Sequence, residues 1–138
     1  PPLLMSFVID ASVTLAWCFE DEATAETDEL LTRLRTESVI VPSIWVFEIA
    51  NALTVAQRRG RLVEAKAVLF ASTLGSLPIE VDPSPPMAPI MAIASAHGLS
   101  AYDAAYLELA ERSGLPLAAL DGRLRDAADS VGVPVLPE

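Results

Sequence analysis

Apolar and polar positions along the chain form two kinds of block. Short apolar or β-branched runs that end at a polar residue or near a proline are typical of strands, and they cover Phe7–Ile9, Ser38–Val41, Pro78–Val81, Leu117–Leu120 and Val133–Leu136. Stretches with apolar residues three and four positions apart predict helices over Ser12–Phe19, Ala25–Arg35, Ile44–Arg59, Leu62–Leu74, Met91–His97, Ala101–Arg112 and Arg123–Ser130. The proline-rich stretch Pro83–Pro89 is expected to be a stiff connection. Strands separated by helices predict an α/β fold, a parallel sheet covered by helices on both faces.

Length and composition favour one globular domain over residues 1–138, because the chain has 138 residues and 52% of them are hydrophobic. No run of apolar residues is long enough for a membrane helix, and the first residues lack the pattern of a signal peptide. Met5 is a candidate natural start, which would make Pro1 to Leu4 an added or disordered extension. The single cysteine, Cys18, has no partner for an internal disulfide, so we expect a cytoplasmic protein.

Two aspartates follow predicted strands. Asp10 comes directly after Phe7–Ile9, and Asp121 directly after Leu117–Leu120. Ligands of open α/β sheets gather outside the carboxyl ends of the strands, so both residues are candidates for a functional site. Each also has a structural alternative, because Asp10 could cap a helix and Asp121-Gly122 could form a turn.

Two further acids lie on apolar helix faces. Glu48 is surrounded by apolar neighbours and shares its helical face with Ala52 and Val55. Asp103 shares a face with Tyr106 and other apolar residues, while Glu108 and Arg112 are predicted to lie on the opposite side. A buried carboxylate needs a cation, hydrogen bonds or a metal ion. The first turn of a helix is a structural alternative for Asp103, since an anion is favoured there.

Together the four acids predict a metal site at one edge of the sheet. Converging carboxylates repel one another and require a counter-cation. Oxygen ligands with free positions suit Mg²⁺, with Mn²⁺ as a substitute. The chemistry that fits such a site is hydrolysis of a phosphodiester bond by water that the metal activates. The formal net charge of −10 opposes this reading, because nucleic-acid-binding proteins are usually basic.

The motifs that carry these acids resemble those of VapC toxins, which are PIN-domain ribonucleases. The resemblance covers almost the whole chain, through His97 to Ala110, Phe7 to Ser12, Val46 to Leu53 and Leu120 to Leu124. It implies a PIN-domain fold with about five short parallel strands sandwiched by helices, and a Mg²⁺-dependent endoribonuclease. It further implies a homodimer, a higher assembly in some members, and a cognate VapB-type antitoxin that blocks the site.

By the same resemblance, Asp10, Glu48, Asp103 and Asp121 are the catalytic and metal-binding residues. Ser12 and Asn51 would support the site, with helix capping and an ordinary polar contact as their alternatives. The chain departs from the family pattern at two positions. Ala119 stands where a Thr is common, and Arg123 where another Asp sometimes occurs. Asp126 is an alternative source of that second carboxylate, with an ordinary helix surface as its other interpretation.

Basic residues are few, and three of them gather at the end of the helix that carries Glu48. Arg58, Arg59 and Arg61 fit a helix C-terminus, which favours cations. Arg59 lies about 16 Å beyond Glu48 at ~1.5 Å per residue, so Arg59, with Arg58 and Arg123, is a candidate contact for RNA phosphates. The acidic run Glu20–Glu22 is expected to be a solvated face, and His97 to have a capping or surface role.

Two other functions fit parts of this pattern. One is a catalytically silent PIN-like module that binds the antitoxin and cleaves nothing, which the charge and Ala119 favour. The other is phosphotransfer on an aspartate, as in receiver domains or haloacid-type phosphatases. Those proteins use a lysine late in the chain, and the only lysine here is Lys66.

Overall fold

A five-stranded parallel sheet forms the centre of the computed structural model, which describes residues 3–138. The sheet order is β3-β2-β1-β4-β5, and the strands are β1 (Leu4–Ile9), β2 (Glu37–Pro42), β3 (Ile79–Asp82), β4 (Leu117–Ala118) and β5 (Val135–Leu136). All four pairings are parallel. The predicted α/β class with about five short parallel strands is confirmed.

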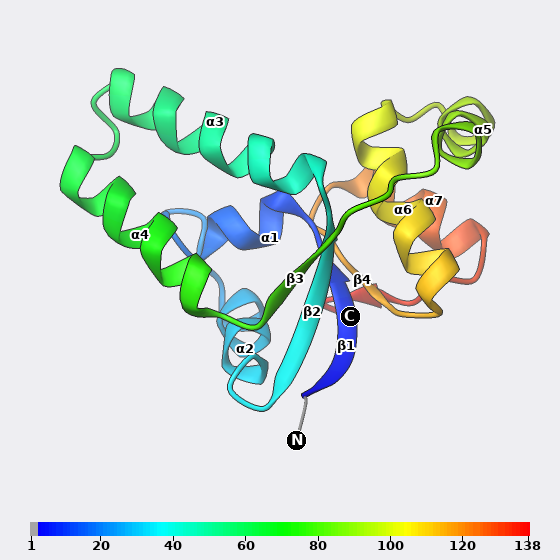
Figure 1. The fold of residues 1–138 in the computed structure, drawn as a ribbon, viewed down its shortest axis with the longest axis horizontal. Coiled ribbons are helices and arrows are strands. Elements are labelled where there is room, and N and C mark those ends of the chain that lie inside the picture. Colours follow the sequence, from blue (N-terminus) through cyan, green and yellow to red (C-terminus); the bar gives the residue numbers. More distant parts are fainter. Residues whose placement is uncertain (1–2) are drawn as a thin grey trace.

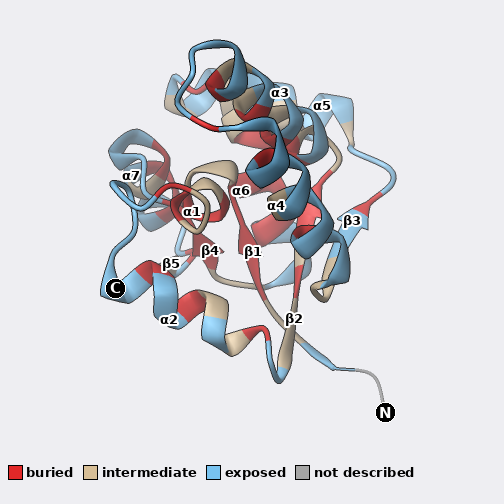
Figure 2. Ribbon diagram, turned by 90° about the vertical axis from the view of Figure 1, so that its left-hand side faces the viewer, coloured by how far each residue is buried: buried red, intermediate tan, exposed pale blue. Residues whose placement is uncertain are grey.

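Helices cover both faces of the sheet (Figure 1). The first group lies on one face and comprises α1 (Ala11–Ala16), α2 (Ala25–Arg33), α3 (Ile44–Arg58) and α4 (Glu64–Ser76). The second group lies on the other face and comprises α5 (Met87–His97), α6 (Ala101–Ser113) and α7 (Gly122–Ser130). The middle strand is buried between the two layers (Figure 2), where Phe7, Val8 and Ile9 have no solvent exposure. None of the helices within residues 3–138 is long and apolar enough to cross a lipid bilayer.

Several predicted boundaries differ from the structure, and three of them have a clear cause or consequence. Helix α5 begins at Met87 and includes Pro89, because a proline in the first turn removes only an N–H that has no partner inside the helix. Helix α4 begins two residues later than predicted, because the N–H groups of Arg61 and Leu62 donate to the Ala56 carbonyl and close the preceding turn. Strand β4 is shorter than predicted and ends at Ala118.

Of the expected N-terminal extension, Leu4 is ordered, because it pairs with Glu37 as the first residue of β1. Pro1 and Pro2, the rest of the expected extension, lie outside the described residues.

Helix α6 is buried on nearly all sides, which corrects the expectation that Glu108 faces away from the core. The helix packs against β1, β2 and β4 and is flanked by α5 and α7. Every residue from Ala104 to Ala110 is buried, and Glu108 is only 5% exposed. Arg112 compensates the buried charge, since its guanidinium contacts Glu108 at 2.9 Å and Asp82, at the end of β3, at 2.8 Å. This ion-pair network joins the central helix to the edge of the sheet.

We predict that Arg112→Leu lowers the free energy of unfolding by about 2 kcal/mol, because it leaves two buried carboxylates without a cation. The cost stays below the 3–5 kcal/mol of fully buried pairs, since the Arg112 side chain is 42% exposed to water. Arg33→Leu is the matched control, because Arg33 pairs with the partly exposed Glu37 and its loss should cost about 1 kcal/mol or less. Urea denaturation of both variants measures the difference. Equal losses would show that the network contributes no more than a surface pair.

Candidate functional site

The candidate site lies at the carboxyl edge of the sheet, where β1 and β4 end side by side. Ile9 pairs with Ala118, so the residues that follow the two strands emerge next to each other. Helices α1 and α7 begin at this edge, and they lie on opposite faces of the sheet (Figure 1). This divergence opens the edge in the way expected of ligand sites in α/β sheets.

Asp10 is the most buried of the four predicted acids, with 5% exposure. It also caps α1, because its Oδ1 accepts hydrogen bonds from the Ser12 hydroxyl at 2.7 Å and from the Val13 N–H at 3.1 Å. Burial raises the pKa of Asp10 to about 6, and the charges of Asp103 and Glu48 act in the same direction, while the two hydrogen bonds lower it. The predicted helix cap is confirmed, and the predicted metal-binding role of Asp10 is compatible with it.

Ser12 connects the two halves of the site. Its hydroxyl donates to Asp10 and accepts a hydrogen bond from the Leu120 backbone N–H at 3.1 Å. The loop after β4 is thereby tied to the end of β1. Because Asp121 follows Leu120 directly, this bridge fixes the position of Asp121 relative to Asp10. Ser12 therefore joins the ends of β1 and β4, and its role as a supporting residue of the site stays a prediction.

Glu48 extends from α3 toward the same edge and is half-buried. It is held by Tyr106, for which the sequence indicated only a place on the apolar face of its helix. The Tyr106 hydroxyl, on α6, donates to Glu48 Oε1 at 2.6 Å. Burial raises the pKa of Glu48, as does the neighbouring Asp103 carboxylate, whereas the bond from Tyr106 lowers it. Burial and the bond to Glu48 raise the pKa of Tyr106, so its hydroxyl keeps its proton and remains a donor. One oxygen of Glu48 is fixed, and the other is left for a ligand.

Asp103 and Asp121 complete the group from α6 and α7. Asp103 lies in the first turn of α6, where its backbone N–H donates to the capping Ser100 hydroxyl at 3.1 Å. Asp121 caps α7, because its Oδ2 accepts from the Leu124 N–H at 3.0 Å. Burial raises the pKa of Asp103, the Asp121 charge raises it further, and the nearby positive charge of Arg123 lowers it.

Electrostatic repulsion links the four acids, with Asp103 as the common neighbour of the other three. None of the ion pairs formed within residues 3–138 involves any of the four carboxylates. The group therefore has an unbalanced negative charge at a partly buried place. A divalent cation is the usual way to balance such a charge, and carboxylate oxygens are its preferred ligands.

The carboxylates are near enough to repel one another but do not form a closed set of ligands. Among the described residues, no three His, Cys, Asp or Glu side chains stand close enough together to hold a metal ion as they are. Hydrogen bonds hold Asp10, Glu48 and Asp121 in their present positions. The donor chemistry fits Mg²⁺ or Mn²⁺, and the side chains would have to come closer together to enclose such an ion.

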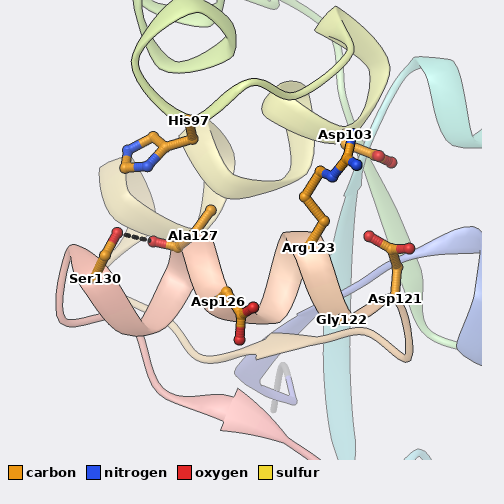
Figure 3. A pocket seen from close by; sticks show the side chains of 8 residues that line it. All are labelled: His97, Asp103, Asp121, Gly122, Arg123, Asp126, Ala127 and Ser130. Atoms are coloured by element: carbon orange, nitrogen blue, oxygen red, sulfur yellow. Dashed lines mark hydrogen bonds between the residues drawn. The ribbon is translucent and has the colours of Figure 1, made fainter.

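The remaining predicted residues are distributed over three places. Arg123 lies beside Asp103 and Asp121, in the groove shown in Figure 3. Asn51 is exposed and lines a separate hollow on the α3 side, with Phe19 and Arg59, rather than the groove at Asp103 and Asp121. Arg58 is exposed at the end of α3, as predicted for a solvated cation.

The acidic run near the start of the chain is not only a solvated face. Arg61 donates to Asp21 at 2.9 Å and to Glu22 at 2.6 Å, and its guanidinium lies 3.8 Å from the centre of the Phe19 ring. Arg61 is therefore paired, whereas Arg58 and Arg59 form no ion pair with any residue from 3 to 138.

We predict that Asp10→Asn stabilises the metal-free protein at neutral pH. The folded-state pKa of about 6 exceeds the ordinary value of 3.8, so the folded protein holds this proton more tightly than the unfolded chain. The stabilisation that comes from protonation of Asp10 is complete below about pH 4 and is lost as the pH rises through 6. Asparagine keeps the helix cap without the buried charge, so at pH 7.5 the gain should be on the order of 2 kcal/mol.

Thermal denaturation at pH 7.5 and pH 4 tests this expectation, with Asp129→Asn, an exposed position on α7, as the charge-matched control. The gain should appear only for Asp10→Asn and only at the higher pH. Equal effects of the two substitutions would show that total charge, not the Asp10 site, is responsible.

Comparison with known proteins agrees with this geometry. Residues 7–130 match the PIN domain family. The chain is 28% identical to ribonuclease VapC3 of Pyrobaculum aerophilum over 133 residues, which are 94% of this chain and 100% of that protein. The crystal structure of PAE2754 from the same organism superposes with a TM-score of 0.76 at 26% identity, over 97% of this chain and 92% of that one.

Two further solved structures share the fold at lower identity. FitAcB from Neisseria gonorrhoeae has a TM-score of 0.65 at 20% identity, over 94% of this chain and 95% of that one. VapC20 of Mycobacterium tuberculosis, described as a sarcin-ricin loop cleaving toxin, has a TM-score of 0.60 at 17% identity, over 88% and 95%. The resemblance to VapC proteins read from the motifs is confirmed, and the chain belongs to the PIN domain family.

Proposed function

We propose that this chain is the toxin of a type II toxin–antitoxin system and acts as a Mg²⁺-dependent endoribonuclease in the cytoplasm. The observation that carries the proposal is the group of four carboxylates around Asp103, which has no paired cation among the described residues and lies at the open edge of the sheet. The similarity to ribonuclease VapC3, together with the toxin VapC20 among the structural neighbours, supports the same activity.

In this proposal Asp10, Glu48, Asp103 and Asp121 hold the metal. When bound, Mg²⁺ or Mn²⁺ makes water a better nucleophile at neutral pH and offsets the charge that develops on the phosphate. Ser12 keeps the ends of β1 and β4 in register through its two hydrogen bonds. Arg123 lies beside the acids, where it would contact a phosphate of the RNA and offset part of its charge.

A silent binding module remains the second candidate. Two observations favour it: the site is not closed around a metal, and Ala119 is fully buried at the end of the sheet, where it offers no polar side chain. Phosphotransfer has less support, because the only lysine, Lys66, is exposed on α4 and does not line the groove at the acids.

Exposed apolar surface supports the proposed protein partners. Helix α5 has no buried residue and presents Met87 and Met91 at 77% and 60% exposure. Its Ile90 lines a hollow together with Tyr102 and Phe47, which are 60% and 69% exposed. We propose that this surface forms the homodimer. A second apolar groove lies between α3 and α4, lined by Trp45, Leu53 and Leu74 among others, and is the surface proposed for the VapB-type antitoxin.

We predict that the chain, purified free of antitoxin, cleaves RNA at discrete sites only when Mg²⁺ or Mn²⁺ is present. Asp10→Asn should lower the rate by at least about a hundredfold, since even residues that only support metal ligands cost 10–100-fold. Asp129→Asn should cleave like the unsubstituted chain. Incubation with total RNA and mapping of the new ends measures the activity. A folded, metal-loaded protein that cuts nothing would favour the silent module.

We predict that Arg59→Gln weakens RNA binding and makes it less sensitive to salt. Each phosphate contact to a single strand contributes about 0.7 to the slope of log affinity against log salt concentration, so the slope should fall by about that amount. Fluorescence anisotropy with Asp10→Asn protein measures binding without cleavage. Arg35→Gln is the control, because Arg35 is exposed beyond the end of α2 and away from α3. An unchanged slope for Arg59→Gln would exclude the contact.

A further inference from the structure

A polar groove continues from the acids along α7 (Figure 3). Its volume is about 800 Å³, within the ~300–1,000 Å³ of sites that hold small organic ligands. Asp103 and Asp121 lie at one end of it. Beyond them, the end of α5 and the exposed side of α7 form the walls. The polar side chains that line these walls are Arg123, His97, Asp126 and Ser130. The length of α7 from Asp121 to Ser130 is about 13 Å, enough for one nucleotide beside the reacting centre.

Arg123 stands at the boundary between the acids and the rest of the groove. Its side chain extends from α7 toward Asp103 in Figure 3, and its charge lowers the pKa of Asp103. Arg123 takes part in none of the ion pairs formed by residues 3–138. Its guanidinium is therefore available for a phosphate, which it can bind through two parallel N–H donors.

The far end of the groove has a different chemistry, because its polar groups on α7 accept hydrogen bonds. The Ser130 hydroxyl donates its proton to the Ala127 carbonyl at 2.7 Å and so offers only lone pairs. Asp126 is exposed and forms no ion pair within the described chain, so both of its carboxylate oxygens are free acceptors. A second phosphate would be repelled here. A base edge that carries N–H donors would be attracted, next to the His97 ring.

We propose that this groove binds one unpaired nucleotide next to the cut, with its phosphate at Arg123 and its base at Asp126, and that it selects guanine. The inference rests on the proposed ribonuclease function. Guanine is the base that presents a ring N–H and an amino group side by side on one edge, which matches the two oxygens of a carboxylate. Sequence-specific recognition of RNA depends on such contacts to unstacked bases.

Replacement of guanosine by inosine tests whether the amino group of guanine is recognised, because inosine keeps the ring N–H and lacks only that amino group. A single-stranded RNA with guanosine or inosine beside the mapped cut site is the substrate, and the full chain is the enzyme. The unsubstituted chain should cut the guanosine RNA about five- to a hundredfold faster, the range for one bidentate base contact. Asp126→Ala should cut both at the same rate. Asp129→Ala, on the same helix but outside the groove, should keep the preference.

Each outcome decides between the inference and its alternatives. Equal cutting of the guanosine and inosine RNAs by the unsubstituted chain would overturn the inference. Loss of all cutting in folded Asp126→Ala protein would also overturn it, because Asp126 would then belong to the reacting centre. The same pair of RNAs is measured for binding with Asp10→Asn protein, without cleavage. If no RNA is cut at all, the proposed function fails, and a binding ratio for short RNAs that contain a single guanosine or a single inosine still decides whether the groove binds guanine selectively.

Discussion

Carboxylates that approach one another without a cation repel, and partial burial makes each of them harder to ionise. Asp10, Glu48 and Asp103 all have raised pKa values for these two reasons, and burial is the larger cause in each case. The surrounding structure withstands this repulsion because each acid comes from a different well-packed element. Asp10 follows the fully buried end of β1, Glu48 extends from α3, and Asp103 begins the central helix α6. The energy stored in this repulsion is what a divalent cation would release on binding.

Hydrogen bonds between distant segments set the spacing of the acids. Trp45 on α3 donates to the Thr14 hydroxyl at 2.9 Å, and that hydroxyl donates to the Asp10 carbonyl at 2.9 Å. Helix α3 is thus fixed against the start of α1, and Glu48 is fixed with it. At the other side, Arg125 donates to the carbonyls of Ala119 and Pro137 and holds the loop before Asp121 to the C-terminal segment. The site is accordingly built on a rigid frame, although none of these residues faces the space between the acids.

The fold was largely predictable because its strands are continuous apolar runs and its helices have clear periodicity. The predictions from sequence were wrong where the pattern of neighbouring residues indicates one structure and contacts with distant segments favour another. Pro89 reads as a helix breaker, but its place in the first turn of α5 makes it harmless. Glu108 reads as a surface residue, but Arg112 and the end of β3 make its burial tolerable. Neither outcome follows from residues adjacent in sequence.

The four candidate acids stand out in the sequence because strand ends and apolar helix faces are unusual places for charges. The residues that hold them were harder to find. Tyr106 is a natural core residue by pattern, and only the contact between α6 and α3 shows that its hydroxyl binds Glu48. The bond from Leu120 to Ser12 spans most of the chain and leaves no trace in the spacing. Asn51 shows the opposite case, a polar residue within a motif that lines another hollow, together with residues that follow α1.

The capping bonds of Asp10 and Asp121 have an evolutionary consequence. Both side chains accept from backbone N–H groups at the start of a helix, and asparagine caps helices as well as aspartate does. Aspartate and asparagine codons differ by a single base, so one point mutation can remove one of these carboxylate charges while the helix start is preserved. Under the proposed function, such a change would remove a metal ligand in one step and keep a folded chain. Folded but inactive variants are therefore expected wherever an aspartate both caps a helix and would hold a metal ion.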